Sequence, residues 1–140
     1  MTYATQQQLI ERFGETEITQ LSDRDRNGAI DSNVVARALA DADALIDSYV
    51  GKRHALPLAE TPPRIAGIAA DIAYFKLFRN DPPDYVRTAF EDAMKALKDI
   101  SNGAAVIELG TGGTEPARDG DVVLTSGADK EFGRDKLAGF

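Results

Sequence analysis

Oxygen-bearing side chains alternate along one short stretch of the chain, Asp23-x-Asp25-x-Asn27-Gly28-x-Ile30-Asp31. Carboxylates at the first and third positions, an amide at the fifth, glycine at the sixth and an acid at the ninth match the front half of a calcium-binding EF-hand loop. The twelfth position, which should supply a bidentate Glu, is Val34. The candidate metal ligands are therefore Asp23, Asp25, Asn27 and Asp31, and calcium is the ion that they would suit.

The same stretch also fits a purely structural turn. Asp and Asn side chains favour turns because they accept hydrogen bonds from nearby backbone N–H groups, and an Asp directly before a helix caps it. In this interpretation Asp31 caps the next helix and no ion is bound. Because the missing Glu removes much of the site's affinity for calcium, the sequence favours the structural turn. We therefore expect no cofactor, and calcium binding is the alternative.

No other set of residues has the spacing of a catalytic site. Gly110-x-Gly112-Gly113 suggests a phosphate-binding loop, but neither a helix nor a Lys-Ser/Thr pair follows it. His54 is the only histidine, has no nucleophile near it in the sequence, and makes at most a small basic spot with Lys52 and Arg53. A surface or packing role is therefore expected for it rather than that of a general base. Asp71 is the one acid in the middle of an apolar helical pattern. Its presence there is explained if it pairs with a base or reaches the surface. We therefore expect no enzyme activity.

Composition narrows the class of protein further. The chain has 140 residues, about one domain, and no cysteine, which excludes disulfides and thiol chemistry. No apolar stretch approaches the length of a membrane span, and no signal peptide is apparent, so we expect synthesis in a cytoplasm. The net charge of −7 argues against wrapping nucleic acid and would suit a surface past which DNA slides without sticking.

Helical periodicity accounts for most of the first 103 residues. Apolar residues recur at spacings of three and four, and capping or breaking residues separate the periodic segments. Thr5 is the expected N-cap of the first helix, and Thr61 that of the helix that begins with Pro62 and Pro63. The expected helices are 6–13, 15–21, 32–50, 62–79 and 84–101. The 62–79 helix is apolar on almost every side, so it should lie at the centre of an all-α bundle of four to five helices, residues 1–103.

Residues 104–140 differ from the rest and are expected to form a glycine-rich arm. Seven of the 12 glycines lie in residues 104–140, and only 106–109 and 122–125 have the pattern of short strands. The closing stretch alternates large apolar and charged residues, as docking segments do. The expected anchors are Phe132, Arg134, Asp135, Leu137 and Phe140; the alternative is that this stretch folds back on its own bundle.

Five stretches spread along nearly the whole chain carry a family resemblance. They are Tyr3-Ala4-Thr5…Leu9-Ile10-Glu11-Arg12-Phe13-Gly14, Leu21-Ser22-Asp23-Arg24-Asp25…Asn27-Gly28-Ala29-Ile30-Asp31, Arg37-Ala38-Leu39-Ala40-Asp41-Ala42-Asp43…Ile46-Asp47-Ser48-Tyr49, Leu56-Pro57-Leu58…Pro62-Pro63, and Phe132-Gly133-Arg134-Asp135…Leu137-Ala138-Gly139-Phe140. Together they resemble a family of tailed-phage proteins of the phage Mu type, encoded among the head and tail morphogenesis genes. His54 departs from the family pattern, which has an aromatic residue such as Tyr there.

The resemblance implies a head-to-tail connector, also called an adaptor or head-completion protein. Similar connectors form a ring, commonly of twelve copies, beneath the portal, and their C-terminal tails reach into neighbouring proteins. The implied partners are other copies of the chain, the portal protein, and a tail terminator or the next connector, with DNA passing through the channel. The implied location is the head–tail junction of the virion. The alternative function is a calcium-binding interaction module built on residues 23–31.

Overall fold

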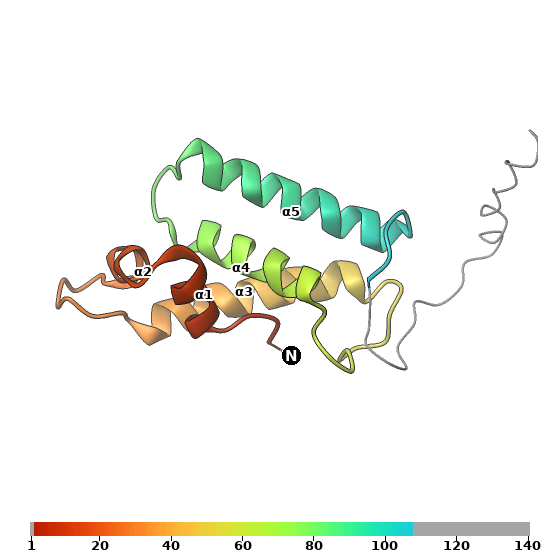
Figure 1. Ribbon diagram of the computed structural model, residues 1–140, viewed down its shortest axis with the longest axis horizontal. Coiled ribbons are helices and arrows are strands. Elements are labelled where there is room, and N and C mark those ends of the chain that lie inside the picture. Colours follow the sequence, from red (N-terminus) through yellow and green to blue (C-terminus); the bar gives the residue numbers. More distant parts are fainter. Residues whose placement is uncertain (1, 108–140) are drawn as a thin grey trace, which may run out of the picture.

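The computed structural model describes residues 2–107, which form an all-α bundle. Its helices are α1 (Gln6–Phe13), α2 (Glu15–Ser22), α3 (Ser32–Val50), α4 (Pro63–Leu77) and α5 (Asp84–Asn102). The three long helices pack side by side with α4 between α3 and α5, while α1 and α2 lie against the C-terminal half of α4 (Figure 1). No strand occurs among residues 2–107. The predicted fold class is confirmed for this part of the chain.

Local signals set the boundaries of α1 as the sequence predicts. The Thr5 hydroxyl accepts a hydrogen bond from the Gln8 N–H at 3.2 Å, and the Gln8 side chain accepts one from the Thr5 N–H at 2.9 Å. This reciprocal capping box satisfies two N–H groups that the first turn leaves without partners. The helix ends at Gly14, whose φ of 97° suits a residue without a Cβ.

The central helix begins and ends at other residues than predicted. Thr61 does not cap α4: the N-cap is Pro62, and no side chain accepts a hydrogen bond from the first turn. A residue before proline is pushed out of the helical region, so Pro62 is extended and the helix begins at Pro63. It ends at Leu77 rather than Arg79 because Phe78 is already extended. The predicted central position is confirmed by the eight buried side chains of α4.

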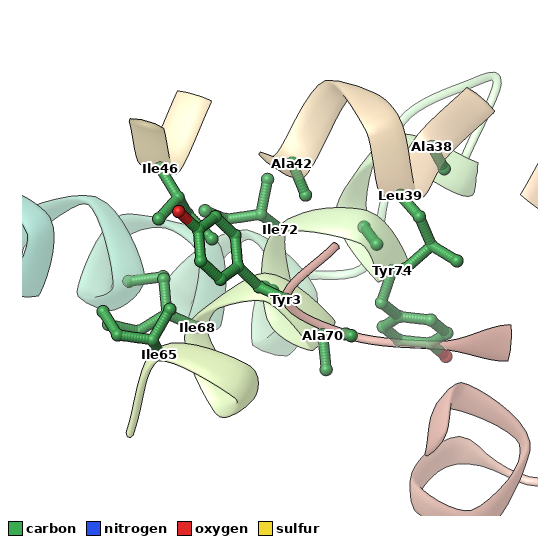
Figure 2. Close-up of a cluster of buried hydrophobic side chains, with 14 of the residues drawn as sticks. Tyr3, Ala38, Leu39, Ala42, Ile46, Ile65, Ile68, Ala70, Ile72 and Tyr74 are labelled. Atoms are coloured by element: carbon green, nitrogen blue, oxygen red, sulfur yellow. The ribbon is translucent and has the colours of Figure 1, made fainter. Parts of the chain in front are cut away.

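The segment before α1 is part of the core. Tyr3 is 2% exposed, and its ring lies beside Ile46 of α3 and Ile65 and Ile68 of α4 (Figure 2). The same cluster continues along α3 and α4 through Ala42, Leu39, Ile72 and Tyr74. The N-terminal residues therefore close the bundle on the side where α3 and α4 meet.

The bundle continues beyond the last helix. α5 ends at Asn102 and is followed by Gly103 with φ 82°, and the Ile107 side chain is 3% exposed within the hydrophobic core. Val106 and Ile107 belong to no strand, and the rest of that predicted strand and all of the second lie outside the described residues. None of the helices in the described part has the length and apolar content to cross a membrane.

Candidate functional site

The loop between α2 and α3 holds the four candidate metal ligands. Asp23 accepts a hydrogen bond from the Asn27 N–H at 2.9 Å through Oδ1 and one from the Gly28 N–H at 2.7 Å through Oδ2. These backbone donors, that of Asn27 first, hold the pKa of Asp23 below its usual value. Both carboxylate oxygens therefore brace the turn in which Gly28 has a φ of 82°.

Asn27 and Asp31 continue the same pattern. The Asn27 Oδ1 accepts from the Ala29 N–H at 3.0 Å. The Asp31 Oδ1 accepts from the N–H groups of Asn33 and Val34 at 3.0 and 3.4 Å, which caps α3. Within residues 2–107, no three His, Cys, Asp or Glu side chains come together in a group that could hold a metal ion. The observed bonds are those of the turn-and-cap interpretation, and calcium binding stays a prediction.

Asp71 is paired with a base, one of the two explanations that the sequence allows. Arg12 of α1 contacts the Asp71 Oδ1 at 2.9 Å through Nη2 and donates to the Gly67 carbonyl at 3.0 Å through Nη1. Burial raises the pKa of the Asp71 carboxyl, and the Arg12 charge opposes this rise. One guanidinium thus holds α1 on α4 through both a carboxylate and a backbone carbonyl.

Two acids of α3 secure the N-terminal segment, which sequence reasoning missed. The Tyr3 hydroxyl donates to the Asp47 carboxylate, and the Tyr3 N–H donates to the Asp43 Oδ1 at 3.0 Å. Burial, followed by these carboxylates, raises the pKa of Tyr3. Apolar periodicity places Asp43 and Asp47 opposite the buried face of their helix. Nothing local in the sequence indicates a partner so far away. The only available signal was a lone aromatic residue before the first helix cap.

Aromatic rings join the short helices to α4. The Tyr74 ring stacks on Phe13 with centroids 3.9 Å apart and meets the edge of Phe78 at 5.3 Å. Its hydroxyl donates to the Glu17 Oε2 at 2.9 Å. The carboxylate of Glu17 is therefore used to orient α2 on α4.

His54 lies inside the protein rather than in a basic surface spot with Lys52 and Arg53. Its side chain is 6% exposed, and its Nε2 has no hydrogen-bond partner within the described part of the chain. The backbone N–H of His54 donates to the Val50 carbonyl at 3.0 Å. The His54 ring is thus part of the protein interior.

The remaining candidates lie outside the described residues. These are the glycine-rich stretch at 110–113 and the predicted docking anchors Phe132, Arg134, Asp135, Leu137 and Phe140. Among the described candidates, Asp23 and Asp31 accept hydrogen bonds from backbone N–H groups, and Asp71 pairs with Arg12. Asp25 lies exposed in the same loop.

Comparison with known proteins identifies the family. The profile of the family described as "Bacteriophage Mu, Gp36" matches residues 3–126, from the buried Tyr3 through all five helices. The chain belongs to the bacteriophage Mu Gp36 family. The resemblance to Mu-type phage proteins is thereby confirmed.

Two relatives extend the match along the chain. The "Mu-like prophage FluMu protein gp36" of Haemophilus influenzae is 29% identical over 138 residues, which cover 99% of this chain and 97% of the relative. "Gene product J" of Escherichia phage Mu is 31% identical over 104 residues, 74% of each chain. This Gp36-family chain is therefore similar to its Haemophilus relative over almost its whole length.

Proposed function

We propose that this Gp36-family protein is a structural virion protein, a head-to-tail connector that forms a ring below the portal and links the capsid to the tail. The observation that carries the proposal is the match to a Mu phage family along residues 3–126, since the Mu-type proteins that the sequence resembles are encoded among the head and tail morphogenesis genes. The proposed partners are other copies of the chain, commonly twelve, the portal protein, and a tail terminator or second connector.

The contacts inside the bundle support a structural role rather than an enzymatic one. Three buried or half-buried polar side chains with raised pKa values each join two elements of the fold. Tyr3 joins the N-terminal segment to α3, Asp71 joins α4 to α1, and Tyr74 joins α4 to α2. In an active site such groups would converge on one pocket. Here they lie at separate helix contacts.

The charge of the chain supports the proposed location. A net charge of −7 disfavours tight binding of phosphates and is compatible with a channel through which DNA passes. DNA would then move past the ring without specific recognition.

Quantitative mass spectrometry of purified phage particles tests the proposal. The copy number of this chain, normalised to the portal protein in the same sample, should be close to one. Particles treated to separate heads from tails provide the control, because a connector stays with one of these two parts and a contaminant follows neither. Absence of the chain from finished particles would reject the connector role.

A further inference from the structure

Three shallow hollows line up along one side of α4. The first, of about 290 Å³, lies between the start of α4 and the residues that follow α5, and is lined by Pro62, Pro63, Arg64, Val106 and Ile107. The second, of about 540 Å³, is lined by Thr2, Tyr3, Thr5, Gln8, Thr61, Pro63 and Ala66. The third, of about 290 Å³, is lined by Gln8, Glu11, Arg12, Ala66, Gly67 and Ala70. Neighbouring hollows share residues, Pro63 between the first and the second and Gln8 and Ala66 between the second and the third, and the three adjoining hollows are together called the α4 trough.

The floor of the α4 trough is low because its residues are small. Ala66 and Gly67 are half-buried and Ala70 is buried, and the third hollow lies between these three residues of α4 and the α1 residues Gln8, Glu11 and Arg12. At the other end Val106 is 57% exposed, one of the few large apolar side chains in the described chain that face solvent. The trough therefore offers apolar surface, above all at Val106, that no other residue of the described range 2–107 covers.

The rim of the α4 trough carries one acid and one base. Glu11 and Arg64 are both exposed, and neither takes part in an ion pair within residues 2–107. Glu11 stands beside the α1 end and Arg64 beside the Val106 end. A complementary ligand would be a peptide with large apolar side chains and charges of both signs.

Residues 132–140 of the chain itself have this composition. Phe132, Leu137 and Phe140 are large and apolar, and Arg134, Asp135 and Lys136 lie among them. We propose that the α4 trough of one copy receives residues 132–140 of a neighbouring copy, with Asp135 facing Arg64 and Arg134 facing Glu11. The choice of a neighbouring copy rests on the ring of the proposed function, in which bodies stand side by side.

Chain length allows this exchange. Ile107 and Phe132 are 25 residues apart, a span of about 80–90 Å when fully extended and about 25–30 Å on average as a flexible coil. The longest helices of the bundle have 19 residues, or about 28 Å. The closing stretch can therefore reach the next body without displacing its own Ile107.

Disulfide cross-linking tests the proposal in the full chain, which has no cysteine of its own. The double variant Ala66→Cys with Ala138→Cys keeps every anchor and places one thiol in the α4 trough. On mild oxidation in phage particles it should give a ladder of covalently joined copies. In the control, Ala44→Cys with Ala138→Cys, the first thiol is on the exposed side of α3. We expect cross-linking there to be roughly 1,000-fold slower, because docking raises the local thiol concentration from micromolar to millimolar.

Charge exchange gives a second, independent readout. Arg64→Glu should slow the cross-link, and adding Asp135→Arg should restore it, since the pair is then reversed rather than lost. Equal rates of disulfide cross-linking for the Ala66→Cys and Ala44→Cys double variants would overturn the proposal. So would a monomeric, concentration-independent cross-link, because it means that the stretch binds its own body.

The same samples separate this inference from the proposed function. If the chain is present in particles at the portal's copy number but no ladder forms, the trough assignment fails and the connector role stands. If the chain is missing from particles, the connector role fails. The trough assignment is then tested by mixing the single variants Ala66→Cys and Ala138→Cys at high concentration. A disulfide-linked heterodimer supports the assignment, and the absence of a heterodimer rejects it.

Discussion

Removing the Tyr3 hydroxyl should cost measurable stability, because it ties the segment before α1 to α3. The Tyr3 side chain is 2% exposed and its hydroxyl donates to the Asp47 carboxylate. A hydrogen bond to a charged group contributes about 1.5–3 kcal/mol. Water can replace part of the contact at the half-buried Asp47, so we expect Tyr3→Phe to lower the free energy of unfolding by about 1.5 kcal/mol. That corresponds to a fall of roughly 5–10 °C in Tm.

Alkaline pH should reduce the difference in the free energy of unfolding between Tyr3→Phe and the parent protein. Burial raises the pKa of Tyr3 above the ordinary tyrosine value of 10.0, so the unfolded chain loses this proton first. The contribution of the hydroxyl is therefore complete below pH 10 and is lost as the pH rises further, by up to about 1.4 kcal/mol per pH unit. Tyr74, whose pKa burial also raises, gives the variant and the parent the same further loss. We expect the difference to shrink by about 1 kcal/mol at pH 11.

Urea unfolding followed by helical circular dichroism at pH 7 and pH 11 measures both effects. Tyr49→Phe is the matched control, because Tyr49 lies on α3, the helix that Tyr3 contacts, and its hydroxyl has no hydrogen-bond partner among residues 2–107. The reasoning is refuted if Tyr3→Phe is as stable as Tyr49→Phe at pH 7. It is also refuted if the difference from the parent is unchanged at pH 11.

Four further predictions concern the core, the buried histidine and, in two cases, the loop between α2 and α3. Leu9→Ala should lower the free energy of unfolding by about 2–5 kcal/mol in urea titration, since Leu9 is fully buried, whereas the exposed Gln7→Ala should change it by less than about 0.5 kcal/mol. His54→Phe should raise it by about 1 kcal/mol by removing a buried nitrogen without a partner; a loss would mean that the site is too small for the ring. Calorimetry of the full chain with millimolar calcium should give no binding heat, because backbone N–H groups occupy both Asp23 oxygens. Asp23→Ala should destabilise the protein at neutral pH, and the difference should vanish as the pH falls below the ordinary carboxyl value of 3.8, since the pKa of Asp23 is lowered in the folded state.

Most of the fold could be predicted, because most of its signals are local. The N-caps at Thr5 and Asp31 act within a few residues of the helix starts, and the structure confirms both. Gly14 and Gly103 directly follow the ends of α1 and α5. The predicted start of α4 was wrong by one residue, because either Thr61 or Pro62 can be the N-cap where two prolines follow each other. The all-round apolar pattern of α4 still predicted its central place correctly.

The candidate sites were harder to predict, because their partners are distant in the sequence. The sequence predicted the turn bonds of Asp23 and Asp31, whose donors are at most five residues away. It left open whether Asp71 pairs with a base or reaches the surface, and the structure shows that it pairs with Arg12 of another helix. It assigned His54 to the surface or to packing, and only the burial of the ring decides for packing.

The sequence by itself determined the helical class, the approximate ends of the helices and the membership of a Mu phage family. Those properties depend on periodicity, on caps and on matching residues, which can be read along one chain. Only the tertiary structure decided that Tyr3 is a core residue bound to α3 across 40 positions, and that Arg12 reaches Gly67 across 55. It also decided that the small residues of α4 lie at the bottom of a trough. Such contacts arise when burial of apolar surface brings helices together, and periodicity shows which face of a helix is buried but not which residue meets it.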